Sequence, residues 1–235
     1  MNKTAIVTGA SRGIGKSIAL KLAKENYKIM LFGRDEKLLN EVKSEINKED
    51  GDADVFVGDV TDENFVKESI GRVIEKHKQI DVLVNNAGVM IAKKFIETNL
   101  DEFKLQVDTN LYGVYNFTKA VLPSMMAKRE GTIINISSIA GKNPVSGGTL
   151  YSSTKHALMG FSKSLMLEVR EYNVRVASVC PGSVDTELLT NTIMAPANSE
   201  KILQPSDVAD VVFSIINLPI RAMISEVEIR PTNPR

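Results

Sequence analysis

Residues 3–15 read KTAIVTGASRGIG, and this stretch decides the fold that we predict for the chain. A short apolar run leads directly into three glycines with the spacing G-x3-G-x-G, namely Gly9, Gly13 and Gly15. The first glycine permits a tight turn out of a strand, the second lets phosphate oxygens approach the backbone, and the third lets the next helix pack closely on the sheet. The amides at the start of that helix then face a pyrophosphate. The stretch therefore predicts a strand, turn and helix that bind a dinucleotide.

Outward from this stretch, apolar runs alternate with amphipathic segments along the chain. The apolar runs are rich in Val and Ile, as strands buried on both faces of a parallel sheet should be, and they cover 3–7, 27–32, 53–58, 80–85, 131–137, 174–180 and 225–230. Helical patterns lie between them, at 13–25, 35–48, 62–77, 99–127, 149–172 and 205–217, with Asp62 and Ser206 as predicted N-caps. The alternation predicts an α/β fold, with a doubly wound parallel sheet of about seven strands and helices on both faces.

We expect residues 1–235 to form a single domain, because the chain shows no linker, tandem repeat or low-complexity segment. The segment from about 185 to 204 breaks the alternation, after the end of a predicted strand. Its position is typical of a mobile lid over a substrate, although an ordinary connection would look the same.

The overall composition narrows the classes of function. The 29 basic and 29 acidic residues balance, so no net field attracts a nucleic acid or a membrane surface. Cys180 is the only cysteine, which excludes an internal disulfide, and its apolar surroundings predict a buried thiol rather than a nucleophile. Apolar runs fall well short of the ~18 residues of a membrane span. We expect a cytoplasmic protein without a metal site.

The end of the second predicted strand, FGRDE at 32–36, reports on the cofactor. Dinucleotide binders that use NAD usually end this strand with an acidic residue that binds the ribose 2′-hydroxyl. Here Arg34 comes first, and Arg12 in the glycine turn is able to reach the same place. Two guanidinium groups suit a 2′-phosphate, which predicts NADP(H) rather than NAD(H). Asp35 leaves two alternatives open, a ribose ligand or the N-cap of the next helix.

The third and fourth predicted strands end in further candidates. Asp59, in GDVTD at 58–62, is placed to accept a hydrogen bond from the adenine amino group. Asn86, Ala87 and Gly88 follow the fourth strand and would lie against the cofactor. Asparagine at this position also has a plain alternative, because it is a common turn residue.

A second constellation begins with YSSTK at 151–155. Tyr151 and Lys155 are four residues apart and so share one helix face. A nearby ammonium stabilises a phenolate, so we expect Lys155 to lower the pKa of Tyr151 and make it a better general acid at neutral pH. Ser138 follows the fifth predicted strand and could donate a hydrogen bond to a substrate carbonyl. Asn110 could hold a water behind Lys155, or it could be an ordinary core or helix-bending asparagine.

Seven motifs in order, TGASRGIG, GDVTD, NNAG, DTNLYG, INISSIAG, YSSTK and CPGSVDT, run from residue 8 to 186. Together they resemble the short-chain dehydrogenase/reductase family in its compact form. The resemblance implies a Rossmann-type sheet and a catalytic set of Ser138, Tyr151 and Lys155 with Asn110 behind it. Tyr151 would be the acid in reduction and the base in oxidation, while Lys155 would also bind the nicotinamide ribose.

Apart from Arg34, the predicted cofactor contacts lie within these motifs. The resemblance implies that the segment after the sixth strand packs on the nicotinamide carboxamide. The full candidate set is Gly9, Ser11, Arg12, Gly13, Ile14, Gly15, Arg34, Asp59, Val60, Asn86, Ala87, Gly88, Tyr151, Lys155, Pro181, Gly182, Val184 and Thr186.

The resemblance and the residues together predict an NADPH-dependent reduction of a ketone or aldehyde to an alcohol. The alternatives are a 3-oxoacyl-acyl-carrier-protein reductase and, in a different class, a non-catalytic dinucleotide sensor. The sensor has no chemical use for Ser138, Tyr151 and Lys155. The chain closes with ISEVEIRPTNPR at 224–235, which resembles broad-specificity carbonyl reductases, some of them of the sepiapterin type. The family commonly forms dimers or tetramers, so we expect a homo-oligomer that acts on a small apolar or amphipathic carbonyl compound.

Overall fold

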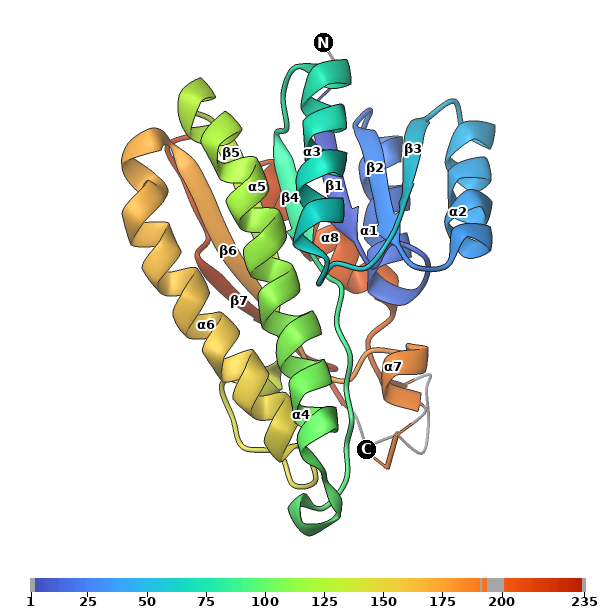
Figure 1. The fold of residues 1–235 in the computed structure, drawn as a ribbon, viewed down its shortest axis with the longest axis vertical. Coiled ribbons are helices and arrows are strands. Elements are labelled where there is room, and N and C mark those ends of the chain that lie inside the picture. The colour runs from blue at the N-terminus through green and yellow to red at the C-terminus, as the bar shows by residue number, and fades with distance from the viewer. Residues whose placement is uncertain (1–2, 191, 194–200, 234–235) are drawn as a thin grey trace.

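The computed structural model describes residues 3–190, 192–193 and 201–233. Within these ranges the strands form one parallel sheet in the order β3-β2-β1-β4-β5-β6-β7 (Figure 1). The strands are β1 (Thr4–Thr8), β2 (Lys28–Gly33), β3 (Asp52–Val57), β4 (Val82–Asn85), β5 (Gly131–Ile136), β6 (Val174–Pro181) and β7 (Glu226–Ile229). The predicted α/β fold, with a parallel sheet of about seven strands, is confirmed.

Helices cover both faces of the sheet. On one face lie α1 (Gly13–Lys24), α2 (Glu36–Lys48) and α8 (Pro205–Ile216), and on the other lie α3 (Glu63–His77), α5 (Gly113–Lys128) and α6 (Thr149–Val169). The remaining described helices are short and are η1 (Phe95–Glu97), α4 (Leu100–Val107), η2 (Asp108–Tyr112), η3 (Ile139–Gly141), η4 (Arg170–Tyr172) and α7 (Glu187–Thr190).

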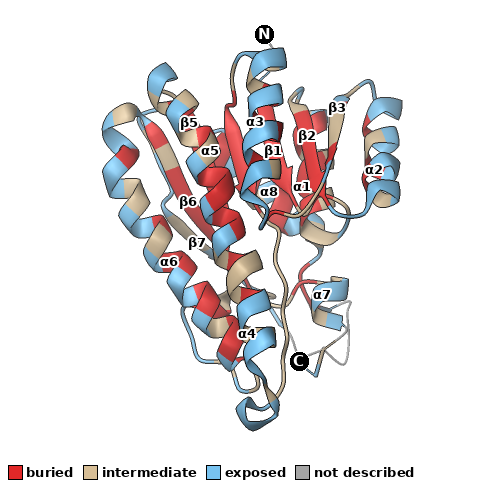
Figure 2. Cartoon of the chain, in the orientation of Figure 1, coloured by how far each residue is buried: buried red, intermediate tan, exposed pale blue. Residues whose placement is uncertain are grey.

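The central strands are apolar because both of their faces are covered. All five residues of β1 are buried (Figure 2). Successive side chains enter opposite layers of the core. Val7 packs with residues of α1 and α8, whereas Ile6 packs with residues of α3 and α5. Cys180 in β6 is fully buried as predicted, and burial raises the pKa of its thiol to about 11.

The order of the strands fixes where a ligand site lies. The chain moves outward from β1 to β3 in one direction and from β4 to β7 in the other, so the order reverses between β1 and β4. Open sheets of this kind leave a crevice outside the carboxyl ends of the strands at the reversal. The glycine turn after β1 and the NNAG segment after β4 both lie at this crevice.

Two local expectations need correction. The helix predicted at 99–127 is divided, because five residues with π-helical bonding, Asp108–Tyr112, separate α4 from α5. Ser206 is not an N-cap, because α8 begins one residue earlier, at Pro205, and Gln204 forms a capping box with Asp207. The predicted cap at Asp62 is confirmed, since its side chain accepts a hydrogen bond from the backbone N–H of Phe65.

No helix within the described ranges has both the length and the apolar character that crossing a membrane requires.

Candidate active site

The glycine turn has the geometry that its spacing predicts. Gly9 and Gly13 have φ angles of +63° and +55°, in the left-handed region that side chains disfavour. A Cβ atom on Gly15 would lie 2.2 Å from the carbonyl oxygen of Gly9, which leaves no room for any side chain. Gly9 is equally confined, because its Cβ would lie 2.9 Å from Ala87 Cα. Helix α1 therefore packs directly against the glycine turn. The turn itself packs directly against the segment after β4.

Two polar side chains tie the turn to the end of β4. Thr8 Oγ1 accepts hydrogen bonds from the backbone N–H groups of Asn86 and Ala87, at 2.9 and 3.0 Å. Asn86 Nδ2 donates to the carbonyl oxygens of Thr8 and Gly9, at 2.9 and 3.1 Å. Asn86 thus performs the turn chemistry that its residue type allowed, and Thr8 is a supporting residue that sequence analysis missed.

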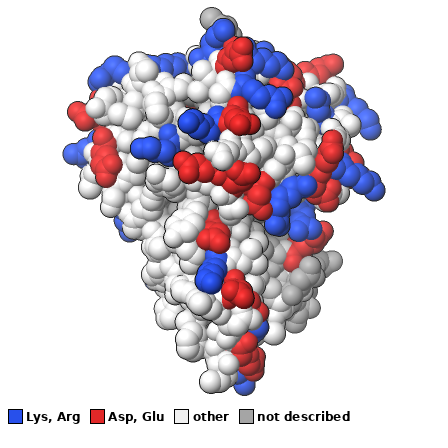
Figure 3. Space-filling model, viewed as in Figure 1, with Lys and Arg blue, Asp and Glu red and all other residues white. Residues whose placement is uncertain are grey.

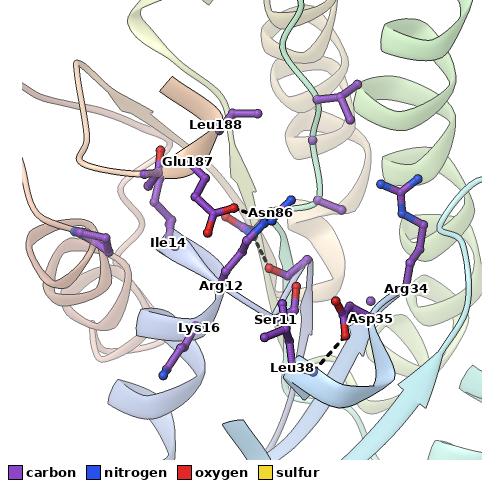
Figure 4. A pocket seen from close by; sticks show the side chains of 18 of the residues that line it. Ser11, Arg12, Ile14, Lys16, Arg34, Asp35, Leu38, Asn86, Glu187 and Leu188 are labelled. Carbon is purple, nitrogen blue, oxygen red and sulfur yellow. Dashed lines mark hydrogen bonds and ion pairs between the residues drawn. The ribbon is translucent and has the colours of Figure 1, made fainter. Parts of the chain in front are cut away.

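A cavity of about 1340 Å³ lies in the crevice beside this turn (Figure 4). Its volume exceeds the ~300–1,000 Å³ of ordinary small-molecule pockets and suits an extended ligand. Most of the predicted cofactor residues line it, namely Gly9, Ser11, Arg12, Gly13, Ile14, Arg34, Asp59, Val60, Asn86, Ala87, Gly88 and Thr186.

Other predicted cofactor residues lie outside this described lining. Gly15 lies beneath the turn, and Tyr151 and Lys155 lie beyond Gly88. The predicted cofactor residues at the end of β6 contact other segments of the same chain instead. Pro181 is paired in register with β7, the N–H of Gly182 donates to a β7 carbonyl at 2.8 Å, and Val184 is buried against Leu203. Contacts of these residues with a cofactor stay a prediction.

The charged side chains near the end of β2 are exposed and already have partners. The Arg34 side chain is 68 % exposed, and its Nη1 lies 3.6 Å from Asp59 Oδ2. Asp59 Oδ1 accepts from the N–H and the hydroxyl of Thr61, both at 2.9 Å. Asp35 Oδ1 accepts from the N–H of Leu38 at 3.0 Å, so the interpretation of Asp35 as the N-cap of α2 is confirmed.

Arg12 reaches away from the turn to α7. Its Nη1 lies 2.5 Å from Oε2 of Glu187, and both side chains are 63 % exposed (Figure 4). Glu187 lines the cavity, but no motif identifies it, because its contact with Arg12 joins residues 175 positions apart.

The predicted catalytic side chains come together at the other end of the cavity. Tyr151, in the first turn of α6, is 8 % exposed, and Lys155, one turn later, is 5 % exposed. Lys155 Nζ lies 5.6 Å from the centroid of the Tyr151 ring and donates a hydrogen bond to the carbonyl of Ile136 at 2.9 Å. Ser138 Oγ accepts a hydrogen bond from the backbone N–H of Ala140 at 3.1 Å, and the Ser138 hydroxyl is close enough to the Tyr151 phenol to affect its pKa. A Cβ on Gly88 would lie 3.8 Å from Lys155 Nζ, so Lys155 lies next to a residue of the cavity lining.

Burial, rather than the neighbouring ammonium, dominates the protonation of these groups. It raises the pKa of Tyr151 to about 12, while the hydrogen bond with Ser138 acts in the opposite direction. It also lowers the pKa of Lys155 to about 8. The Tyr151 pKa is therefore shifted in the direction opposite to the one expected from Lys155, because desolvation disfavours the charged form of each group. At neutral pH the phenol of Tyr151 keeps its proton.

The side-chain amide of Asn110 is hydrogen-bonded to the segment that follows β4. It lies in the π-helical residues between α4 and α5 and is 1 % exposed. Its Oδ1 accepts from the N–H of Val89 at 2.9 Å, and its Nδ2 donates to the carbonyl of Val89 and to Thr154 Oγ1, both at 3.0 Å. We call residues 89–93 the strap. The core interpretation of Asn110 is confirmed, and a water behind Lys155 stays a prediction.

Two more α4 side chains bind the strap, and sequence analysis missed both. Gln106, four residues before Asn110, is fully buried and accepts from the N–H of Ile91 at 3.1 Å. Glu102, four residues earlier, forms an ion pair of 2.5 Å with Lys93. Four residues of helix and two of extended chain each advance about 6–7 Å. Alternate strap residues therefore meet successive turns of α4, and the spacing of the polar side chains along the helix was the available signal.

The predicted lid at 185–204 is described only in part, because residues 191 and 194–200 lie outside the described ranges. The N–H of Asp185 donates to the carbonyl of Leu203 at 2.8 Å, so the two ends of the segment are joined. Ile193 packs toward Gly147, whose added Cβ would lie 3.1 Å from its Cδ1. A lid function stays a prediction.

Comparison with known proteins agrees with this geometry. The family model described as short chain dehydrogenase matches residues 3–196. A protein of Staphylococcus saprophyticus, named an uncharacterized oxidoreductase, is 38 % identical over 98 % of this chain and 97 % of its own. The structure of a metagenomic short-chain oxidoreductase in complex with NADP is 36 % identical, with a TM-score of 0.85 over 98 % of this chain and 97 % of the other.

An alcohol dehydrogenase of the archaeon Thermococcus sibiricus, complexed with 5-hydroxy-NADP, is 29 % identical, with a TM-score of 0.91 over 99 % of this chain and 97 % of the other. The resemblance seen in the motifs is thus matched along nearly the whole length of the chain and in its three-dimensional arrangement. The chain belongs to the short-chain dehydrogenase family.

Proposed function

We propose that the protein is an NADPH-dependent oxidoreductase that reduces a ketone or aldehyde to an alcohol. The observation that carries the proposal is the position of Ser138 and Lys155 around the Tyr151 phenol, beside Gly88 at the edge of the large cavity. A proton donor, a hydroxyl that can orient a carbonyl, and a dinucleotide-sized cavity thus adjoin one another.

The residues present fit a phosphorylated dinucleotide. The confined glycines keep the backbone bare around the start of α1, and the first amides of a helix attract phosphate oxygens. Arg12 and Arg34 line the same cavity and would hold a 2′-phosphate. The two similar structures that are complexed with NADP or its 5-hydroxy derivative support the same choice. When bound, the nicotinamide supplies the hydride.

The chain supplies the proton and the orientation. Tyr151 donates its phenolic proton to the carbonyl oxygen as the alcohol forms, and Ser138 donates a hydrogen bond to the same oxygen. Lys155 lies close enough to stabilise the phenolate that remains on Tyr151. A pKa of about 12 keeps the phenol protonated at neutral pH, as the proton donor of a reduction must be.

The substrate is proposed to be a small apolar or amphipathic carbonyl compound. Met90 and Leu188 bring apolar side chains to the cavity lining. Within the described part of the proposed lid, Leu188 and Ile193 are 41 % and 71 % exposed, which leaves apolar surface on this segment.

No observation favours the acyl-carrier-protein alternative. Its acidic partner would need free basic groups beside the cleft. Lys93 forms an ion pair with Glu102, and Lys128 forms one with Asp81 at 2.6 Å, at the far end of α5 from the cavity (Figure 1). A non-catalytic sensor would not need the buried Tyr151 and Lys155 with Ser138 beside them.

A homo-oligomer is proposed as the working state, with α4, α5 and α6 as its contact surface. Leu105, Tyr112, Tyr115 and Leu167 are large apolar side chains that are 45 % to 58 % exposed on these helices and on the turn that joins them. Figure 3 shows that the lower left flank, over α5 and α6, carries few charges, whereas charged side chains crowd the upper part. An uncharged face of this kind suits a second copy of the chain.

The test is oxidation of NADPH and of NADH by the purified protein across ketones, aldehydes, diketones, quinones and 3-oxoacyl thioesters. We expect turnover with NADPH and a preference for a small carbonyl compound. Turnover with NADH alone would contradict the proposed cofactor. Tight NADPH binding with no turnover on any carbonyl would contradict the proposed reaction.

A further inference from the structure

Arg12 and Glu187 face each other across the cavity from segments that are distant in sequence. Arg12 is the N-cap residue of α1, and Glu187 is the first residue of α7. Arg12 Nη1 and Glu187 Oε2 are 2.5 Å apart, and both residues line the cavity. Each side chain is 63 % exposed, so solvent and an entering ligand can reach the pair.

A carboxylate and a phosphate compete for a guanidinium because both present paired oxygens to its N–H groups. The proposed function assigns Arg12 to the 2′-phosphate of the cofactor. The same Nη1 donates to Glu187 Oε2. We propose that Glu187 is a built-in competitor of the cofactor phosphate and thereby sets the affinity for NADPH. This inference rests on the proposed function.

The two arginines of the site differ in how closely each is paired with a carboxylate. Arg34 also faces a carboxylate, but the distance to Asp59 Oδ2 is 3.6 Å and the other Asp59 oxygen is held by Thr61. The Arg12 pair is the closer of the two and has its carboxylate on α7, which also presents Leu188 to the cavity. When a phosphate takes Arg12, it releases the Glu187 carboxylate from the glycine turn.

The size of the effect follows from exposure. Ion pairs between exposed side chains are worth about 0.2–1 kcal/mol, so removal of the competitor should tighten NADPH binding roughly two- to fivefold. The gain should shrink at high salt, because exposed charges are screened within ~10 Å at 0.1 M ionic strength. NADH has no 2′-phosphate and should gain little.

The experiment is calorimetric titration of NADPH, NADH and adenosine 2′,5′-bisphosphate into the wild type and Glu187→Gln, at low and at 0.5 M salt. Glu36→Gln is the matched control, since Glu36 is an exposed glutamate of the same cavity lining. Together with Arg12→Gln and the double variant Arg12→Gln/Glu187→Gln, the wild type and Glu187→Gln form a double-mutant cycle for the Arg12–Glu187 pair. We expect Glu187→Gln to bind NADPH and the bisphosphate more tightly, Glu36→Gln to show no comparable gain, and the gain to vanish when Arg12 is absent.

Equal or weaker NADPH binding by Glu187→Gln would overturn the inference, as would a gain that persists without Arg12 or one that NADH shares equally. These failures are distinct from failure of the proposed function. If the wild type binds and oxidises NADPH while Glu187→Gln changes nothing, only the inference falls. If the wild type prefers NADH, the proposed cofactor falls and takes the inference with it.

Discussion

The charged side chains at the nucleotide end and those at the catalytic end of the site differ in their exposure to solvent. At the nucleotide end, the arginine side chains are 63 % and 68 % exposed and lie against the carboxylates of Glu187 and Asp59. At the catalytic end, Tyr151 and Lys155 are 8 % and 5 % exposed, and burial shifts both of their pKa values away from the charged form. Exposed groups can exchange one ionic partner for another, whereas burial changes the pH at which a group gains or loses its proton. The first property suits recognition of a charged cofactor, and the second suits transfer of a proton.

The largest effect is expected at the catalytic end. Tyr151→Phe removes the proton donor but keeps the ring, so we expect turnover to fall by about 10²- to 10⁴-fold while NADPH binding stays within a small factor of the wild type. Single-turnover kinetics and calorimetric titration measure the two quantities separately. Near wild-type turnover would remove Tyr151 from its proposed role.

The pH dependence should follow Lys155. Its pKa is lowered to about 8, so the ammonium is present below that pH and is lost above it. Because the ammonium supports the Tyr151 phenolate, we expect kcat/KM for carbonyl reduction to fall as the pH rises through about 8. Its decline should approach tenfold per pH unit.

A profile of kcat/KM from pH 6 to 10 measures this decline. The Tyr151 phenol should not contribute to it, since its pKa of about 12 lies above the range. A flat profile would show that burial does not control the protonation of Lys155.

At the nucleotide end, the effects should be smaller and depend on the cofactor. Arg34→Ala removes a charged donor to the proposed 2′-phosphate, which is worth about 1.5–3 kcal/mol, so NADPH affinity should fall roughly tenfold or more. NADH affinity should change little. Titration of both cofactors tests this, and an equal loss for both would place Arg34 elsewhere.

The smallest effect concerns Asp35, next to Arg34. Asp35→Ala removes the N-cap of α2, so the free energy of unfolding should fall by ~1 kcal/mol, with little change in cofactor affinity. Asp35→Asn is the control, because asparagine caps a helix without a charge. Urea unfolding measures the stability. A large change in NADH affinity for both variants would restore Asp35 as a ribose ligand.

Much of the fold was predictable because it depends on local patterns. Buried parallel strands are apolar on both faces, so each strand can be recognised as a short run of consecutive apolar residues. The glycine turn was predictable for a similar reason, since Gly9 and Gly15 occupy places where any side chain collides with the backbone. Asp62 illustrates the same rule for helix ends, because a cap depends on only a few neighbouring residues.

The remaining site residues could not be predicted from neighbouring sequence. Gln106 and Glu102 matter because α4 lies beside the strap, and Glu187 matters because α7 approaches the glycine turn. No local pattern contains these contacts.

The sequence by itself determined the positions of the strands along the chain, the glycine turn and the candidate catalytic side chains, because backbone sterics and hydrophobic periodicity act over a few residues. Only the tertiary structure decided the direction in which the pKa values of Tyr151 and Lys155 shift and the ionic partner of Arg12. The physical reason is that burial and ion pairing depend on atoms brought together by folding. At Tyr151 the surrounding protein outweighs the lysine one helical turn away, which reverses the expected direction of its pKa shift.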